Sequence, residues 1–458
     1  MTLLIKNGTV VTAAETYAAD VLCEGETIAA IGPGLEAPEG AEVVDATGKY
    51  VMPGFIDPHV HIYLPFMGTF AKDTYDSASR AALVGGTTTL IEMCCPSRQE
   101  DPLEGYDLWR SKAEGVSACD FTFHMGVTRF DDDTPAKLKR IVDDGVTSFK
   151  VFLAYKGFFG VDDDELYRTL KLAKELGVVV TAHCENETLV AERQRELLAA
   201  GKTGPEWHEP SRPASVEAEG VHHLAAFAEQ TGASVYVVHT SCRPAVEAAL
   251  AARARGVDIT LETVIPYLVL DNTYAEKPDF EGAKYVMSPP IRSAEHQDYL
   301  WGALADRTVS TVATDHAPFD FAGQKEMGRE DFTLIPNGIP SVEDRANLLF
   351  THGVQRGRFD LTTFVDAAST QAAKAFGLYP RKGEVAVGSD ADLVVYDPEW
   401  RGAISAETHL MDTDYSAFEG WELQGRPSLV TVRGKVMARD GAFVGELGHG
   451  QFLKREPQ

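Results

Sequence analysis

Basic residues are scarce in this sequence. Its 458 residues contain 42 Lys and Arg against 69 Asp and Glu, which gives a formal net charge of -27 at pH 7. A surface this acidic repels phosphate backbones, and no local basic patch reverses the charge, so the sequence predicts no nucleic-acid partner. No apolar run approaches the roughly 18 residues needed to span a bilayer, and the N-terminus lacks the pattern of a secretory signal. We therefore expect a cytoplasmic protein that does not enter the membrane.

Cysteine is also rare. The six cysteines are Cys23, Cys94, Cys95, Cys119, Cys184 and Cys242, and no two of them form a CxxC pair. Sparse cysteines, two of them adjacent, do not make a disulfide framework, and the missing CxxC spacing argues against a zinc finger. We expect most of these side chains to be reduced and buried in the core.

The two ends of the chain share a β-rich pattern. Residues 3–50 alternate apolar and polar positions with glycine punctuation, and a similar pattern returns at 391–396 and 428–436. Such alternation predicts short strands with one buried face. We predict that residues 1–52 and 378–458 together form one β-sandwich domain.

The middle of the chain, residues 53–377, alternates strand-like and helical segments. Apolar runs lie at 88–93, 149–153, 178–181 and 235–238, and helical patterns at 164–176 and 215–231. Repeated β and α segments over roughly 300 residues predict an α/β fold, a (β/α)₈ barrel of the TIM type. A doubly wound sheet is the main alternative, but no GxGxxG motif opens a helix after a strand.

A pair of histidines, His59 and His61, follows an apolar strand start. Residues two apart on a strand project to the same face, so both imidazoles can reach one metal ion. Such pairs also arise by chance on exposed strands. Here the position favours a metal site, because barrel active sites lie at the carboxyl ends of strands.

A lysine, Lys150, lies inside the apolar run 147–155. Lysine is almost never fully buried without a partner. Burial without an anion favours the neutral amine, which can capture carbon dioxide as a carbamate, and a carbamate can bridge two metal ions. From this run alone, a lysine that is salt-bridged or reaches solvent is the more common outcome.

Three further strand ends carry residues that bind metals, namely His183, His239 and Asp315. A lone histidine is usually a hydrogen-bonded core residue. Packing, however, does not require His, Lys and Asp at five separate strand ends, whereas a two-metal site does. Two ions about 3.5–4 Å apart lower the pKa of a bridging water and polarise a carbonyl.

The joint pattern resembles the amidohydrolase superfamily, and more closely its dihydropyrimidinase and hydantoinase group of cyclic amidases. The resemblance covers nearly the whole chain. It is carried by His-Val-His at 59–61, Ser-Phe-Lys at 148–150, Ser-Arg-Pro at 211–213, Met-Ser-Pro-Pro at 287–290, Thr-Asp-His-Ala-Pro-Phe at 314–319, Ile-Pro-Asn-Gly-Ile-Pro at 335–340 and Asp-Tyr at 414–415.

The resemblance implies a ligand set for two divalent metal ions. His59, His61 and Asp315 would hold one ion, His183 and His239 would hold the other, and carboxylated Lys150 would bridge them. Zinc is the expected metal, since it suits His and oxygen ligands with open positions, and Mn²⁺ or Co²⁺ could substitute. The carboxylates Asp57 and Glu185, and His316, are candidates for orienting these ligands.

The resemblance also implies catalytic and substrate-binding roles. Asp315 would take a proton from the bridging water and deliver it to the leaving nitrogen. Tyr155 would donate its hydroxyl to the oxyanion of the tetrahedral intermediate. Ser288 and Asn337 would hold the amide edge of the ring, largely through backbone groups.

Departures from related patterns narrow the substrate. Dihydroorotases show HxHxR, whereas Ile62 and Tyr63 follow His61 here, so the arginine that would bind a substrate carboxylate is missing. Ser341 stands where the group usually has Gly. The side chains predicted to line an apolar pocket for the ring substituent are Leu64 in the loop 62–68, Cys94, Cys95, Phe152 and Phe159. Ordinary packing is the alternative for them.

The leading functional hypothesis is hydrolysis of a dihydropyrimidine or a 5-substituted hydantoin to an N-carbamoyl amino acid. Hydrolysis of another ring amide, such as allantoin or a cyclic imide, is the alternative within the same chemistry. A non-enzymatic scaffold with this fold is the alternative from a different class, and the complete ligand set argues against it. The resemblance further implies a homotetramer.

Overall fold

Eight parallel strands form the centre of the structure, a computed structural model that describes residues 2–457. In sheet order they are β6 (Phe55–Val60), β9 (Thr87–Cys94), β10 (Asp120–Gly126), β11 (Ser148–Phe152), β12 (Val179–His183), β13 (Val235–Val237), β14 (Ile259–Val264) and β15 (Thr311–Ala313). Every residue of β6, β9, β10 and β11 is buried. Burial on both faces is the ordinary state of parallel strands.

The first and last strands of this sheet meet. Val60 at the end of β6 forms a parallel bridge with His316 just after β15. The His61 N–H donates a hydrogen bond to the carbonyl oxygen of His316 at 2.7 Å. The sheet therefore nearly closes into a barrel, and the predicted fold class is confirmed for the middle of the chain.

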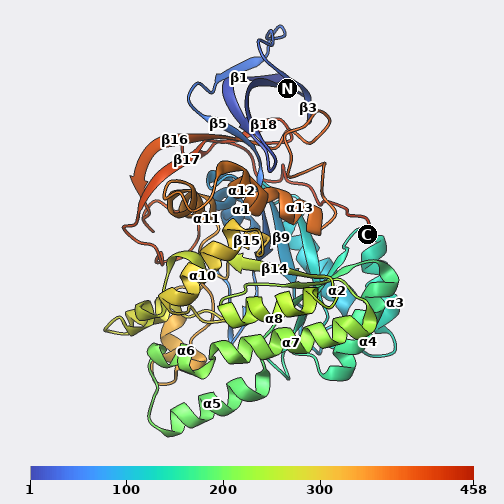
Figure 1. Cartoon of the computed structure of the whole chain (residues 1–458), viewed down its shortest axis with the longest axis vertical. Helices are drawn as coiled ribbons and strands as arrows, with labels where there is room; N and C mark the ends of the chain where they lie inside the picture. The colour runs from blue at the N-terminus through green and yellow to red at the C-terminus, as the bar shows by residue number, and fades with distance from the viewer. Residues whose placement is uncertain (1, 458) are drawn as a thin grey trace.

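Helices connect the strands, and most of them surround the barrel (Figure 1). They are α1 (Tyr75–Val84), α2 (Pro102–Ala113), α3 (Thr134–Asp143), α4 (Asp163–Leu176), α5 (Glu187–Ala199), α6 (His208–Ser211), α7 (Ala214–Thr231), α8 (Arg243–Arg253), α9 (Ile265–Val269), α10 (Ala294–Ala305), α11 (Arg345–Leu349), α12 (Leu361–Val365) and α13 (Gln371–Ala375). A hairpin of β7 (Pro65–Phe66) and β8 (Thr69–Phe70) precedes α1. Within residues 2–457, no helix is long and apolar enough to cross a membrane.

Helix α4 illustrates how local sequence sets an element. The Asp162 carboxylate accepts a hydrogen bond from the Glu165 N–H at 2.8 Å, and the Glu165 carboxylate accepts one from the Asp162 N–H at 2.9 Å. This reciprocal cap satisfies N–H groups that have no partner within the helix. The helix ends at Gly177, whose left-handed φ of 66° costs glycine little. Leu170 and Ala173 lie on the buried face that packs on the barrel.

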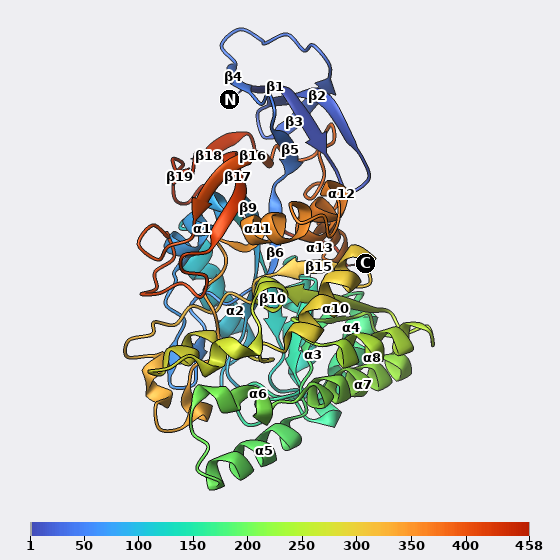
Figure 2. The same ribbon diagram turned by 60° about the vertical axis from the view of Figure 1, so that its left-hand side comes forward.

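A second, mixed sheet combines strands from both ends of the chain (Figure 2). In sheet order it contains β19 (Ala442–Phe443), β18 (Lys435–Arg439), β17 (Glu422–Val432), β16 (Leu393–Ala403), β5 (Tyr50–Pro53), β1 (Thr2–Val11), β2 (Thr16–Glu24) and β3 (Thr27–Gly32), with β4 (Glu42–Asp45) paired to β1. Val51 of β5 lies opposite Val395 of β16 in an antiparallel pair. The predicted assembly of a β domain from both termini is confirmed.

The predicted boundaries at residues 52/53 and 377/378 stay predictions. The last described residues leave the mixed sheet and return to the barrel. Phe452 forms a bridge with Phe121 of β10, and Leu453 is fully buried. The C-terminal segment therefore packs on the barrel as well as on its own sheet.

A buried ion network joins the mixed sheet to the barrel. Lys382 Nζ lies 2.6 Å from a carboxylate oxygen of Asp120, 2.7 Å from one of Asp392 and 3.0 Å from one of Asp390. Arg433 forms a further ion pair with Asp120, the first residue of barrel strand β10. Burial alone would lower the pKa of Lys382, but the three carboxylates outweigh burial and raise this pKa.

Replacing Lys382 with methionine is expected to lower the free energy of unfolding by about 3–5 kcal/mol, because the buried carboxylates lose their shared cation. Denaturant titration measures this difference. Lys49→Met is the matched control, since Lys49 Nζ lies 3.9 Å from Asp397 in a partly exposed pair. Such pairs contribute about 0–1 kcal/mol. Equal stabilities of the two variants would contradict a structural role for the network.

Candidate metal centre

The predicted metal ligands gather at the carboxyl ends of the barrel strands. His59 lies in β6 with His61 directly after it, Lys150 lies in β11, His183 ends β12, and His239 and Asp315 follow β13 and β15. All six side chains are buried. They meet at the end of the barrel where active sites of this fold class occur.

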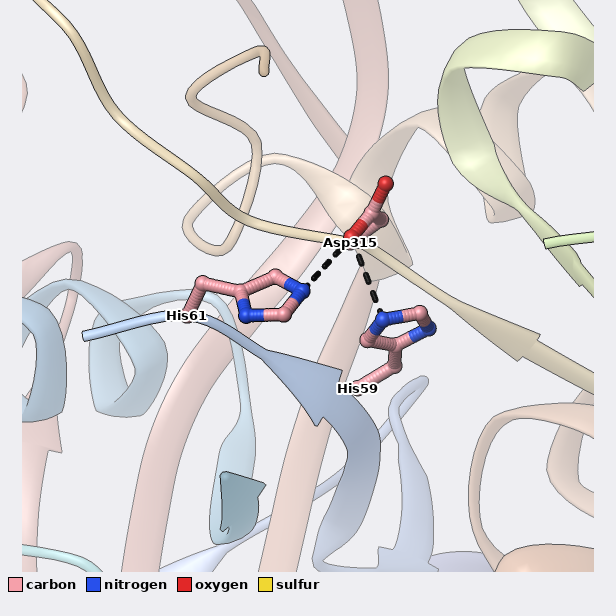
Figure 3. A group of neighbouring side chains, drawn as sticks. All are labelled: His59, His61 and Asp315. Atoms are coloured by element: carbon pink, nitrogen blue, oxygen red, sulfur yellow. Dashed lines mark ion pairs between the residues drawn. The ribbon is translucent and has the colours of Figure 1, made fainter. Parts of the chain in front are cut away.

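His59, His61 and Asp315 form a compact cluster (Figure 3). One carboxylate oxygen of Asp315, Oδ1, lies 3.1 Å from His59 Nε2 and 3.2 Å from His61 Nε2. Burial lowers the pKa of both imidazoles, which keeps a lone pair available on each ring. Two neutral imidazoles and one carboxylate are a donor set for a divalent metal, so the cluster can hold an ion.

His183 and His239 form a second pair of rings beside this cluster. His183 Nδ1 lies 2.9 Å from His239 Nε2, and the ring centroids of His239 and His59 are 5.3 Å apart. Burial lowers the pKa of His239 well below its usual value. Because His183 Nδ1 and His239 Nε2 face each other, the two rings are candidate ligands for a second ion.

Lys150 carries a buried amine. Its Nζ is fully buried, forms no hydrogen bond within residues 2–457 and lies 4.8 Å from the centroid of the Phe152 ring. Burial lowers the pKa of Lys150 from its usual value. The side chain is therefore biased towards the neutral amine, the form that can react with carbon dioxide.

Two buried glutamates hold the histidine rings. Glu262 of β14 lies 2.8 Å from His59 Nδ1 and accepts a hydrogen bond from the His239 N–H at 3.0 Å. Glu185 lies 2.8 Å from His183 Nε2 and 2.6 Å from an Arg212 nitrogen. Burial raises the pKa of Glu262 to about 8. Burial would also raise the pKa of Glu185, but Arg212 and His183 outweigh it and lower this pKa to about 2.

The orienting carboxylates differ in part from those expected. Glu185 contacts a ligand ring as predicted, whereas Asp57 contacts none. Asp57 instead accepts hydrogen bonds from the Thr314 hydroxyl at 2.6 Å and the His59 N–H at 3.2 Å. Sequence reasoning missed Glu262, although a charged residue inside an apolar strand is the same signal that singled out Lys150.

Two further histidines are hydrogen-bonded in the core near the ligands. His316 Nε2 lies 2.8 Å from an Asp73 carboxylate oxygen, and His316 Nδ1 accepts a hydrogen bond from the Ser341 N–H at 3.1 Å. His124 lies 2.6 Å from the Ser148 hydroxyl through Nδ1. His316 therefore braces the segment that carries Asp315, and Ser341 takes part through its backbone.

A cavity opens beside the predicted metal ligands. It is lined by His61, Leu64, Phe66, Lys150, Phe152, Tyr155, Phe159, His183, His239, Ser288, Asp315, Ala317 and Asn337. The predicted pocket residues Leu64, Phe152 and Phe159 are thus brought together, and Phe66 of the predicted loop 62–68 lines the cavity with them. The ring centroids of Phe152 and Phe159 are 5.3 Å apart, which gives one side of the cavity an aromatic wall.

Cys94 and Cys95 do not line this cavity, contrary to the expectation for them. Both are fully buried among apolar side chains, Cys94 as the last residue of β9 and Cys95 directly after it. All six cysteines are buried and free, as expected from their spacing.

The polar side of the cavity is built from Tyr155, Ser288 and Asn337. The Asn337 side-chain amide donates a hydrogen bond to the Ser288 hydroxyl at 2.9 Å. Burial raises the pKa of Tyr155, so its hydroxyl keeps its proton. Tyr155, His239 and Asp315 all have positive φ values, of 63°, 40° and 51°. Backbone strain of this kind collects at functional sites, where the surrounding structure maintains it.

Comparison with known proteins identifies the family. The amidohydrolase family matches residues 50–437 of the chain. The chain belongs to the amidohydrolase family. A D-hydantoinase (dihydropyrimidinase) structure from Thermus sp. matches this amidohydrolase with a TM-score of 0.98 and 65% identity over 99% of both chains.

Two curated relatives agree with this result. The D-hydantoinase of Geobacillus stearothermophilus is 48% identical over 456 residues, which cover 99% of this amidohydrolase and 97% of the relative. The dihydropyrimidinase of Rattus norvegicus is 38% identical over 462 residues, covering 99% and 89% respectively. The family resemblance found in the sequence motifs is confirmed.

Glu262→Gln in this amidohydrolase is expected to weaken metal binding about 10- to 100-fold, because a neutral amide orients the His59 ring less firmly than a carboxylate. Competition with a chelator measures the affinity. Glu92→Gln is the matched control, since Glu92 is equally buried with a pKa also raised to about 8 by burial, yet bonds to Ile62, Tyr75 and Trp109. The same affinity in both variants would rule out this role for Glu262.

Proposed function

We propose that this amidohydrolase opens the ring of 5-substituted hydantoins and dihydropyrimidines to give N-carbamoyl amino acids. The observation that carries the proposal is the cavity in which metal-ligand side chains, an apolar wall and a polar edge converge. The names of its relatives, D-hydantoinase and dihydropyrimidinase, describe the same class of reaction.

The residues present fit a two-metal site. His59, His61 and Asp315 would hold one divalent ion, most simply Zn²⁺, while His183 and His239 would hold a second. When bound, two such ions would lower the pKa of a water molecule and polarise the ring carbonyl. The convergence of His183 Nδ1 and His239 Nε2, 2.9 Å apart, and the buried Lys150 Nζ, which has no hydrogen-bond partner within residues 2–457, support this assignment. Mn²⁺ or Co²⁺ could replace zinc.

Carboxylation of Lys150 would complete the ligand set. Reaction of its neutral amine with carbon dioxide forms an N–C bond and releases one proton, which leaves a carboxylate on the lysine stem. The low pKa that burial gives Lys150 favours this reaction. The same step removes an unpartnered buried amine from the barrel.

The remaining groups suit the chemistry of ring opening. Asp315 would take a proton from the attacking water and deliver it to the leaving ring nitrogen. The Tyr155 hydroxyl, still protonated, would donate a hydrogen bond to the oxyanion that develops on the carbonyl. Ser288 and Asn337 would hold the amide edge of the ring.

The apolar wall would accept the ring substituent. Leu64, Phe66, Phe152 and Phe159 form this wall, and no arginine from the described part of the chain lines the cavity. Alkyl or aryl substituents therefore suit the site better than a carboxylate. Allantoin and cyclic imides stay alternative substrates, and a non-enzymatic scaffold would have no need of the complete ligand set. Following the family resemblance, we also propose a homotetramer.

Ring opening is expected with dihydrouracil or 5-substituted hydantoins, and Lys150→Ala should abolish it because the bridging carboxylate is lost. Loss of ultraviolet absorbance and product mass measure turnover by protein supplied with Zn²⁺ and bicarbonate. Lys156→Ala is the control, an exposed lysine outside the cavity. Turnover of allantoin alone would favour the alternative substrate. No turnover by protein that carries two metals per chain would refute the proposal.

Tyr155→Phe is expected to lower kcat about 10²- to 10³-fold with a smaller change in KM, because the lost hydroxyl acts mainly in the transition state. Steady-state kinetics measure both constants. Tyr167→Phe, on the exposed face of α4, serves as the control. An unchanged kcat for Tyr155→Phe would remove Tyr155 from the catalytic groups.

A further inference from the structure

Lys325 is a buried lysine that the metal centre does not use. Its side chain is fully buried, and its Nζ donates hydrogen bonds to three backbone carbonyl oxygens. The distances are 2.8 Å to Val286, 2.7 Å to Pro336 and 2.7 Å to Gly338. Burial is the sole influence on its pKa, which falls well below the usual value, and no charged group of residues 2–457 counters it.

The three carbonyls match an ammonium group. An ammonium has three N–H donors, whereas a neutral amine has two and would turn its lone pair towards one carbonyl oxygen. Burial favours the amine, but the acceptor geometry favours the ammonium, and we assign the ammonium on this ground. The carbonyls of Pro336 and Gly338 have no other donor among the described residues. An apolar side chain at position 325 would leave both unpaired.

Lys325 lies at the junction of the two loops that form the polar edge of the cavity. Val286 precedes Ser288 by two residues, and Pro336 and Gly338 flank Asn337. The Gly338 N–H donates to the Val286 carbonyl oxygen at 3.0 Å, which ties the loops directly. A Cβ atom at Gly338 would lie 2.3 Å from the Ala317 carbonyl oxygen, so this loop is also packed closely against the segment after Asp315.

The bond to Pro336 sets the direction of a neighbouring donor. The Pro336 carbonyl and the Asn337 N–H belong to one planar trans peptide unit and point in opposite directions. Because Lys325 holds the carbonyl, the Asn337 N–H points away from Lys325. That N–H has no hydrogen-bond partner among residues 2–457, and Asn337 lines the cavity. A charged donor on the carbonyl also polarises the peptide unit and strengthens its N–H as a donor.

We propose that Lys325 is a positioning residue for substrate: by anchoring the Pro336 carbonyl, it aims the Asn337 N–H at a carbonyl oxygen of the ring. The inference rests on the proposed function, since it concerns how that site binds a cyclic amide. Lys325 touches neither the metal ligands nor the reacting atoms. Its loss therefore weakens binding of the ring more than it slows the chemical step.

The test compares Lys325→Met and Lys325→Gln with wild type. KM for a hydantoin is expected to rise about tenfold in Lys325→Met, with kcat changed less and metal content unchanged. Lys325→Gln keeps two N–H donors and should show an intermediate KM. Amide hydrogen exchange of the 335–339 segment should become faster in Lys325→Met, a readout that needs no turnover.

Lys284→Met is the matched control, because Lys284 lies two residues from Val286 but pairs with Glu281. If the wild-type enzyme opens no ring, but amide exchange is still faster in Lys325→Met, the anchoring role of Lys325 is supported and only the proposed function is refuted. An unchanged KM in an active enzyme would overturn the role of Lys325. If both Lys325 variants lose kcat, bound metal and folded structure together, the positioning role is overturned as well. A role of Lys325 in folding would then explain all of these losses.

Discussion

The contact between the first and last barrel strands is the interaction on which the site depends. His59 and His61 come from the start of the barrel and Asp315 from its end, so their cluster exists only where β6 meets β15. The backbone bond from His61 to His316 makes that junction, and the His316 ring is held in turn by Asp73. The cluster of His59, His61 and Asp315 therefore forms only when the sheet closes.

The site's electrostatics are local and owe little to the net charge of the chain. Two buried glutamates, each in contact with a ligand histidine, have pKa values on opposite sides of neutrality. Glu185 is paired with Arg212, which outweighs burial, whereas the hydrogen bonds to Glu262 from Tyr236 and from the His239 N–H, together with the charge of Lys150, do not outweigh burial. His183 therefore lies beside an ionised carboxylate, that of Glu185, whereas His59 lies beside Glu262, a carboxyl group that can carry a proton.

Local sequence was sufficient for the barrel and the terminal β domain, and it singled out the side chains that gather at one end of the barrel. His59 with His61, and Lys150 in an apolar run, depart from the composition of a core strand, and family motifs supplied the rest. The prediction that Cys94 and Cys95 line the pocket was wrong, because the alternation of side chains along β9 does not reveal which of them reach a cavity. Glu262 and Lys325 escaped notice because their partners, His59 and Pro336 among them, become neighbours only through the tertiary fold.

Strand β5 pairs with β1 on one side and with β16 on the other. During synthesis β5 leaves the ribosome long before β16, so one edge of the N-terminal sheet stays open while the whole barrel is made. An open edge offers unpaired N–H and C=O groups to any neighbouring chain. Nascent chains therefore carry an aggregation-prone edge at β5 until residues 393–403 have been made and pair with it.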